Sequence, residues 1–438
     1  AYPITGIQPD LIRKSARVIA GARPASIIHP GRRTTWYGDD TQRLRAMAIL
    51  TALLGSWGRR GGYLLPSAME LPSFPYTKYA YKPKEKVDRR GPESYPLAGE
   101  TLASGLCDAT MKGDFPYNLK AWLVYGSNLI QSLPDPKQTV EAIQKLDSII
   151  AVDVLPSEIC GWADVVLPEC TYLERCDDVW APYYKEPFLA VRQPVVEPMY
   201  DSKPGWWMAK ELAHRIGLED YFPWKDAVEY SKHRVRSAGF SCDVVRKTGV
   251  ELGKVVPVCE EEGLALSFDT RSGKIELYNE DLKNLGFHPL PEYVAQDEPP
   301  AGMFRLLFGR APSHTFGRTA NNRFLAQVFP ENEVWINKKA ARALPGFEDP
   351  PLKTGDRVVL VNQDGIRSNP ILVKITERIR GDCVYMVHGW GHTAKRLGYA
   401  YNRGASDSQL VSRYKVDPIM GGTGMNVNFV SIARPEAR

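Results

Sequence analysis

The stretch Val124-Tyr-Gly-Ser-Asn128, with Val152-Asp-Val-Leu-Pro156 and Ala163-Asp-Val-Val-Leu-Pro168, predicts the fold of the middle of the chain. Each segment begins as a short apolar run and ends in polar or turn-forming residues. A helical pattern at 137–146 separates the first two, and this alternation is typical of an open parallel α/β sheet. Such sheets bind ligands where their strands end.

Four residues stand at these predicted strand ends: Gly126, Ser127, Asn128 and Asp153. Glycine lets a ligand approach the backbone, and asparagine offers both a donor and an acceptor, so the first three can line a phosphate or a pterin edge. Asp153 can accept hydrogen bonds from a ribose or guanine edge. Taken alone, each of these residues is more typical of a plain turn.

Composition limits the class of protein. A chain of 438 residues predicts two to three domains, and 56 basic against 51 acidic residues give no argument for a nucleic-acid partner. No apolar run reaches the length of a membrane span, and residues 1–7 lack the pattern of a signal peptide. The seven cysteines include no CxxC pair, so their spacing favours ordinary thiols over a zinc site or an iron-sulfur cluster.

The pattern along the chain predicts five parts. Residues 1–62 are the end of a first α/β domain, with helices at 7–20 and 41–55 and a buried strand at Ala25–His29. Residues 63–117 form an irregular connecting segment. A second α/β domain at 118–217 is closed by a helix at 206–216. Residues 218–303 mix short helices with a hairpin at 266–278 and a proline-rich linker at 297–302. Residues 304–438 carry short strands spaced by turns, which predict a small closed β-barrel: 304–308, 333–336, 357–361, 371–375, 383–387 and 427–432.

Three loops carry candidate chemistry. Gly309-Arg-Ala-Pro-Ser-His-Thr315 supplies a cation, hydroxyls, an imidazole and backbone amides, a set that fits a pyrophosphate; a capped surface loop is the alternative. His388-Gly-Trp-Gly-His392 places two imidazoles around an aromatic ring, but no third zinc ligand is indicated nearby. In His29-Pro-Gly-Arg-Arg33, the adjacent Arg32 and Arg33 can attract an anion or offset developing negative charge, unless they are surface ion-pair residues.

Together these segments resemble the later two thirds of the molybdopterin oxidoreductases, the dimethyl sulfoxide reductase family. The resemblance rests on Thr5-Gly-Ile7, the helix and double glycine within 41–62, the 126–128 and 163–168 segments with Leu173-Glu-Arg175, and the region 309–432. Within the family the chain looks most like the catalytic subunits of polysulfide and thiosulfate reductases. That likeness rests on Trp36-Tyr-Gly-Asp-Asp-Thr-Gln-Arg43, Asp201-Ser-Lys-Pro-Gly-Trp-Trp207 and Gly421-Gly-Thr-Gly-Met-Asn426.

The resemblance implies Rossmann-like parallel-sheet domains followed by a small β-barrel of the double-psi type. It also implies a bis(molybdopterin guanine dinucleotide) cofactor carrying molybdenum, with tungsten as the alternative metal. Gly126, Ser127, Asn128, Asp153 and Arg175 would hold one arm of this cofactor. The barrel side would contribute a second set, namely Gly309, Arg310, Ser313, His314, Thr315, His388, Trp390 and Asn426. Arg33, or as second choice Arg32, would be the basic residue over the metal.

Two family features have no match in this sequence: the four-cysteine iron-sulfur segment and the residue that ligates the metal. The resemblance therefore implies a C-terminal portion, with the iron-sulfur cluster on a missing N-terminal catalytic portion. Other implied partners are an iron-sulfur electron-transfer subunit, a quinol-oxidising membrane anchor and a small sulfur-anion substrate, at the periplasmic or extracytoplasmic face. The expected activity is cleavage of sulfur-sulfur bonds in anaerobic respiration. Alternatives are another oxyanion reductase, a formate dehydrogenase, or a non-catalytic cofactor-binding or assembly module.

Overall fold

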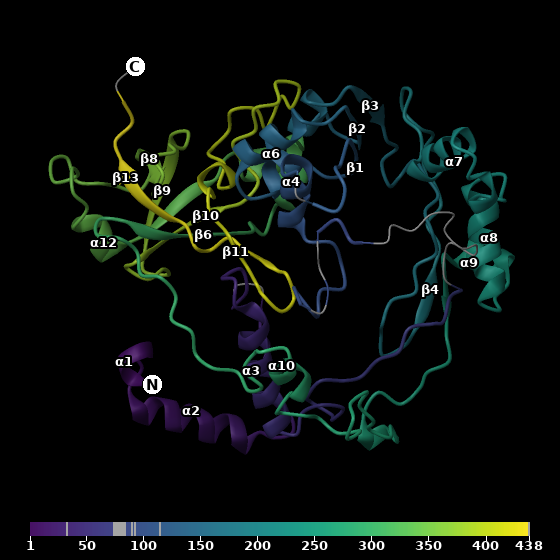
Figure 1. The fold of residues 1–438 in the computed structure, drawn as a ribbon, viewed down its shortest axis with the longest axis horizontal. Coiled ribbons are helices and arrows are strands. Elements are labelled where there is room, and N and C mark those ends of the chain that lie inside the picture. Colours follow the sequence, from purple (N-terminus) through teal and green to yellow (C-terminus); the bar gives the residue numbers. More distant parts are fainter. Residues whose placement is uncertain (32–33, 73–84, 89–90, 92, 114, 437–438) are drawn as a thin grey trace. The chain divides into compact units, whose positions relative to one another are not determined.

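The computed structural model of the chain describes residues 1–31, 34–72, 85–88, 91, 93–113 and 115–436 (Figure 1). The chain forms two compact units. Unit 1 comprises Ala1–Arg32, Gln42–Lys82 and Glu169–Glu292, and unit 2 comprises Arg33–Thr41, Pro83–Pro168 and Tyr293–Arg438. Within the described ranges, every helix is too short or too polar to cross a lipid bilayer.

A parallel sheet forms the first part of unit 2, as the sequence predicts. Its strand order is β1 (Ala121–Tyr125), β2 (Ser148–Asp153) and β3 (Val165–Pro168), and both pairings are parallel. Helix α6 (Pro136–Ile143) lies between β1 and β2 in the chain. Asp135 caps this helix by accepting a hydrogen bond from Gln138 N at 3.2 Å, and Pro136 fits its first turn because no backbone N–H is needed there.

One face of the sheet packs into a hydrophobic core. Trp122, Val124, Ile149 and Ala151 alternate with residues of the other face and bury against residues of the neighbouring helices. These helices include α4 (Ala103–Met111) and α5 (Leu129–Ser132), while the short helix η2 (Glu158–Gly161) follows β2. Packing of this face against the helices thereby fixes the positions at which β1 and β2 end.

A closed six-stranded barrel forms the second part of unit 2 and confirms the predicted barrel. The strand order around it is β10-β6-β13-β8-β9-β7. All six predicted strands exist, with ends shifted by no more than two residues: β6 (Phe304–Gly309), β7 (Glu333–Asn337), β8 (Arg357–Asn362), β9 (Ile371–Thr376), β10 (Cys383–Val387) and β13 (Phe429–Ala433). Alternate residues point inward and form the largest apolar core of the chain, which includes Leu306, Ile336, Leu360 and Met386.

Shorter elements complete unit 2. They are η5 (Phe316–Arg318), α11 (Arg323–Val328), α12 (Lys338–Arg342), η6 (Ser408–Leu410), β11 (Lys415–Val416) and β12 (Thr423–Gly424).

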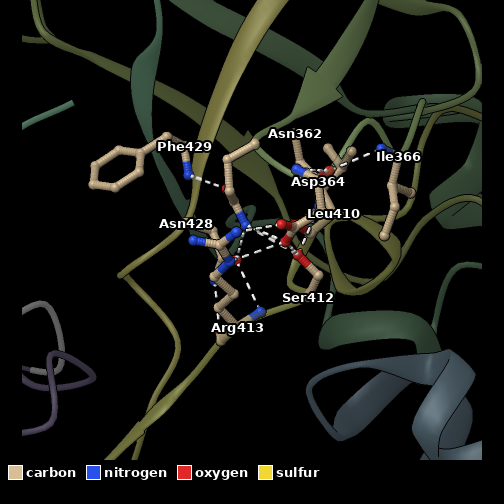
Figure 2. A network of polar contacts seen from close by, with 9 residues as sticks. Asn362, Asp364, Ile366, Leu410, Ser412, Arg413, Asn428 and Phe429 are labelled. Carbon is tan, nitrogen blue, oxygen red and sulfur yellow. Dashed lines mark hydrogen bonds and ion pairs between the residues drawn. The ribbon is translucent and has the colours of Figure 1, made fainter. Parts of the chain in front are cut away.

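A polar network ties the end of β8 to the start of β13 (Figure 2). The buried Asn362 amide donates to Leu410 O at 3.0 Å and to Ser412 Oγ at 2.9 Å. Asn428 donates to Arg413 O at 2.8 Å, and the Arg413 guanidinium in turn binds the carboxylate of Asp364. The network therefore anchors residues 410–413, which comprise the last residue of η6 and the three residues after it, to the closed barrel.

The regular elements of unit 1 are mainly helices. Its elements are α1 (Tyr2–Thr5), α2 (Pro9–Gly21), most of α3 (Asp40–Leu53), β4 (Phe188–Ala190), α7 (Gly205–Arg215), η3 (Glu219–Tyr221), α8 (Ala227–Ser237), α9 (Cys242–Thr248), β5 (Val250–Leu252), η4 (Glu260–Glu262) and α10 (Glu280–Asn284). The predicted helices at 41–55 and 206–216 exist as α3 and α7. The helix predicted at 7–20 is α2, and the shorter α1, which ends at Gly6 in the left-handed conformation (φ 68°), precedes it.

Two predictions for this unit are wrong. Ala25–His29 is not a buried strand: Ile27 is 55 % exposed and the segment joins no sheet, because its apolar residues have no neighbouring strand among the described residues to pair with. Residues 266–278 form a turn, in which Gly273 N donates to Thr270 O at 3.1 Å, but the flanking residues do not pair as a hairpin. The predicted domain boundaries stay a prediction; helix α7, which they include in the domain of β1–β3, belongs to unit 1.

Candidate functional site

The two predicted loops of the barrel meet in the structure. Gly309 ends β6, and its carbonyl accepts a hydrogen bond of 2.8 Å from His388 N, the residue after β10. These strands are parallel neighbours, so both loops leave the barrel at the same end. The motifs at 309–315 and 388–392 therefore begin side by side, although about 75 positions separate them.

His388 is held by a buried carboxylate. Its Nδ1 lies 2.7 Å from Asp407 Oδ2, and the Asp407 side chain is 2 % exposed. Burial would lower the pKa of His388, but the charge of Asp407 and the hydrogen bond to it outweigh burial and raise that pKa above its usual value. Because Asp407 engages Nδ1, Nε2 is the ring atom of His388 that remains for a ligand.

Aromatic rings connect this loop with the segment that follows the arginine pair. The ring of Trp36 stacks on Phe308 at 5.5 Å, and Phe308 lies 6.3 Å from the imidazole of His388. Phe316 packs edge-on against the same imidazole at 5.4 Å and carries the Arg310 guanidinium on its face at 4.3 Å. The guanidinium of Arg310 is thereby held near His388, and this arrangement favours an anionic group such as a diphosphate.

Asn426 belongs to the same end of unit 2. Its backbone N–H donates to Trp36 O at 2.8 Å, and its Nδ2 donates to Thr35 O at 3.3 Å. Residues 35 and 36 follow Arg32 and Arg33 after one intervening residue, Thr34, but the arginines themselves lie outside the described residues. Their assignment as basic residues over the metal stays a prediction.

At the sheet end, Gly126 and Asn128 shape the loop after β1. Gly126 has a left-handed backbone (φ 59°), donates from its N–H to Val152 O at 2.8 Å and has open space beside its Cα. The Asn128 amide donates to Glu158 Oε2 at 2.6 Å. Ser127 between them is half-buried. The Asp153 carboxylate is used within its own turn, where it accepts from Leu155 N and Ser157 Oγ, each at 3.2 Å.

Several of the predicted residues serve packing or ion pairs. Both ring nitrogens of His314 have partners, Thr319 Oγ1 at 3.2 Å and Phe329 O at 3.0 Å. Trp390 is 2 % exposed and packs edge-on against His314. Thr315 N donates to Thr319 Oγ1 at 2.8 Å, and Ser313 is half-buried.

Arg175 belongs to unit 1, whereas the residues with which it was grouped belong to unit 2. Its guanidinium pairs with the carboxylates of Glu169 and Asp177, the latter at 2.7 Å. The role of Arg175 in holding the cofactor stays a prediction, as do the roles of the other assigned residues.

Sequence reasoning missed Asp407, Glu158, Phe308 and Phe316. The run of small residues Gly404-Ala-Ser-Asp-Ser408 was a usable signal, because such runs pack closely and bury whatever polar group they carry. Glu158 gave no local signal, since its partners are distant in the sequence. Across the described part of the chain, no group of three or more histidine, cysteine or carboxylate side chains is arranged to hold a metal ion.

The residues of unit 2 fit a ligand that carries N–H donors and a diphosphate. Asn128 Oδ1 and Asn426 Oδ1 are buried carbonyl oxygens without a donor among the described residues. A buried, unpaired acceptor costs about 1–3 kcal/mol, and a ligand N–H can recover this free energy. Amino and ring N–H groups of pterin and guanine supply such donors, and Arg310 with His388 supplies cationic groups for the diphosphate.

Comparison with known proteins defines the class. The pattern of the molybdopterin oxidoreductase family matches residues 26–215, and that of the molybdopterin dinucleotide-binding domain matches residues 304–429, which span the barrel. The chain belongs to the molybdopterin oxidoreductases.

Among curated relatives, the molybdopterin-containing subunit PhsA of thiosulfate reductase from Salmonella typhimurium is 27 % identical over 468 residues, covering 98 % of this chain. Acetylene hydratase from Syntrophotalea acetylenica is 29 % identical over 318 residues and covers 66 % of the chain. Dimethyl sulfoxide reductase DmsA from Escherichia coli is 24 % identical over 480 residues, covering 99 %. The chain spans 60 %, 43 % and 56 % of the lengths of these three relatives.

A solved structure shares the fold. Acetylene hydratase from Pelobacter acetylenicus superposes with a TM-score of 0.76 at 22 % identity, covering 99 % of this chain and 64 % of that one.

Proposed function

We propose that this chain is the cofactor-binding portion of the catalytic subunit of a reductase that cleaves the sulfur-sulfur bond of polysulfide or thiosulfate in anaerobic respiration. The observation that carries the proposal is the similarity to a thiosulfate reductase subunit along 98 % of the chain. The cofactor is bis(molybdopterin guanine dinucleotide) with molybdenum, or tungsten as the alternative metal. The barrel of unit 2 is then of the double-psi type.

The residues of this chain would bind and orient the cofactor. When bound, that cofactor supplies the two-electron chemistry. Asn128 and Asn426 accept hydrogen bonds from its N–H groups, while Arg310 and the imidazolium of His388 offset the charge of a diphosphate. Asp407 keeps His388 protonated over a wider pH range, since it raises the pKa of the imidazole. Arg33, or as second choice Arg32, would offset the negative charge of a sulfur anion.

An apolar surface of unit 2 supports the expected polypeptide partner. Leu123, Ile150 and Val165 are register partners on β1, β2 and β3, and thus lie side by side on the face opposite the sheet's core. Leu123 is 53 % exposed and Val165 is 46 % exposed. Parallel sheets are normally covered on both faces. We assign this face to the N-terminal catalytic portion, which would also carry the iron-sulfur cluster.

The proposed function also implies the remaining partners of the protein and its location in the cell. Electrons would come from membrane quinol through an anchor subunit and an iron-sulfur subunit, with the enzyme at the extracytoplasmic face of the membrane. Salt-washed membranes that retain the protein only when the anchor subunit is expressed would support this arrangement, and protein found free in the cytoplasm would contradict it.

The deciding experiment uses the protein purified from its source with all copurifying chains. Released pterin guanine dinucleotide, molybdenum, tungsten and iron are quantified, and sulfide release is measured with reduced viologen and either thiosulfate or polysulfide. Two dinucleotides per metal and rapid sulfide release are expected. Bound pterin without sulfide release would reject the proposed substrate.

Assays on the same purified protein distinguish the proposed function from two other functions. Curated relatives include dimethyl sulfoxide and arsenate reductases, which favours another oxyanion reductase as the second candidate. Turnover of arsenate, dimethyl sulfoxide or formate in place of the sulfur substrates would establish that candidate or a formate dehydrogenase. Protein without metal or pterin, and without a companion chain, would indicate a non-catalytic binding or assembly module.

A further inference from the structure

The carboxylate of Glu158 is buried between two loops of unit 2. One is the sheet-end loop, residues 126–128 after β1, and the other is the barrel loop, residues 388–407 after β10. Glu158 begins η2, and its side chain is 4 % exposed. Its Oε1 accepts hydrogen bonds from Thr393 N at 2.7 Å, Ala394 N at 3.2 Å and His392 Nδ1 at 3.0 Å. Its Oε2 accepts from Asn128 Nδ2 at 2.6 Å.

This arrangement determines the direction of the Asn128 amide. A carboxylate can only accept hydrogen bonds, so the amide nitrogen must face Glu158 and Oδ1 must face away. Burial would raise the pKa of Glu158, but the hydrogen bond and charge of His392, with backbone N–H groups, outweigh burial and hold that pKa at about 2. Glu158 is therefore an acceptor throughout the physiological pH range.

We propose that Glu158 is a positioning residue that makes Asn128 present a hydrogen-bond acceptor, so that the loop after β1 binds an N–H edge of its ligand and not a phosphate. The inference rests on the proposed function and deepens it. Pterin and guanine share the edge in question, in which an amino group stands next to a ring N–H and a carbonyl. Phosphate oxygens would be repelled by Asn128 Oδ1, because both are acceptors.

The substitution Glu158→Gln tests the role through its geometry. The Oε1 position faces two backbone N–H groups that cannot reverse, so the oxygen of the new amide must stay there. Its nitrogen then faces Asn128, which can pair only by rotating its own amide and presenting Nδ2 outward. We expect this variant to retain about tenfold less pterin dinucleotide than the unmodified protein, because a donor replaces an acceptor.

Asn128→Asp provides a rescue that a merely structural role would not give. As a single substitution, Asn128→Asp places two carboxylates against each other and should also lower retention of the pterin dinucleotide. Combined with Glu158→Gln, one oxygen of the new carboxylate accepts from the new amide and the other again faces outward as an acceptor. We expect the double variant to recover most of the retention. A double variant no better than either single variant would overturn the proposal.

Asp164→Asn is the matched control, since Asp164 accepts a hydrogen bond of 2.8 Å from Ile149 N in the same sheet but has no contact with the barrel loop in the described structure. We expect its retention to equal that of the unmodified protein. Two pairs of soluble probes show whether guanine or pterin supplies the N–H edge, and the members of each pair differ in the amino group. The first pair is guanosine diphosphate and inosine diphosphate, and the second is 6-carboxypterin and 6-carboxylumazine. The probe that keeps its amino group should bind about tenfold better in one pair.

Hydrogen exchange of the Asn128 side-chain NH₂, followed by its ¹⁵N signal, tests the positioning role independently of the proposed function. In the unmodified protein its NH₂ should exchange slowly with solvent, and in the Glu158→Gln variant it should exchange faster. Slow exchange in a protein that carries no pterin would reject the proposed function and keep the positioning role. Equal exchange in both proteins would reject the positioning role.

Discussion

The Thr41 hydroxyl donates a hydrogen bond of 2.7 Å to the carboxylate of Asp417, although 376 positions separate the two residues. The same carboxylate accepts from the backbone N–H of Thr41 at 2.9 Å, of Ile419 at 3.0 Å and of Met420 at 2.8 Å. Asp417 is 1 % exposed. It fixes the start of α3 and the 417–421 turn, which both lie near the strand pair β11–β12 of unit 2.

Replacing Asp417 by alanine should lower the free energy of unfolding of unit 2 by about 3 kcal/mol, because several buried donors lose their acceptor at once. Thr41→Val removes one hydroxyl donor and should cost about 1 kcal/mol. Urea unfolding followed by tryptophan fluorescence measures both. Equal costs for the two variants would show that the backbone N–H groups find other partners.

Stability should depend on pH through His388. The pKa of its imidazole is raised in the folded state, so its contribution is fully present below the unfolded pKa of about 6.5 and is lost as pH rises through the folded value. The melting temperature of the His388→Asn variant should therefore lie furthest below that of the unmodified protein in mild acid. The gap should narrow with rising pH. His214→Asn, at an exposed site, serves as control, and a gap that widens with pH would contradict the pairing with Asp407.

Glu158 has the opposite dependence. Its pKa falls from 4.5 to about 2 on folding, so its contribution is present above pH 4.5 and is lost as pH falls towards 2. The shift corresponds to about 3 kcal/mol. Glu158→Gln should therefore be less stable than the unmodified protein at pH 6, with a difference that shrinks between pH 4.5 and pH 3. Urea midpoints across this range give the result, and a constant difference would mean that Glu158 does not change its pKa on folding.

Gly391 should not tolerate a side chain. Its backbone is left-handed (φ 74°), and an added Cβ would lie 2.3 Å from Ser406 N. Gly391→Ala should destabilise the barrel loop by at least about 2 kcal/mol and lower retention of the pterin dinucleotide. Gly398→Ala is the control from the same loop, because an added Cβ there meets no atom within 4 Å. Matching thermal melts for the two variants would count against close packing at Gly391.

The regular elements of unit 2 could be predicted because their signals are local. Strands such as β8 and β9 are apolar runs between turn residues. The loop at 354–356 and the turn at 362–365 mark the two ends of β8. The same reasoning failed at Ala25–His29, where an apolar run meets no partner strand in the described part of the chain. Strand identity depends on partners as well as on composition.

The contacts that organise the candidate site could not be predicted, because they join distant positions. Glu158 and His392 are 234 residues apart, and nothing in the sequence around either residue indicates the other. Asn128 was selected for its place at a strand end, but the direction of its amide follows only from Glu158. Likewise, the pair of His388 and Asp407 requires the fold of the 388–407 loop.

The position of β13 in the barrel has a consequence for biosynthesis. This strand, Phe429–Ala433, lies between β6 and β8, so the ring of strands stays open until β13 itself has left the ribosome. Until then β6 has no antiparallel neighbour, and the loop that begins at Gly309 lacks its final support. Translation must therefore pass Ala433 before this barrel can close around its ligand loops, and a stop codon just before β13 would yield a chain whose barrel cannot close.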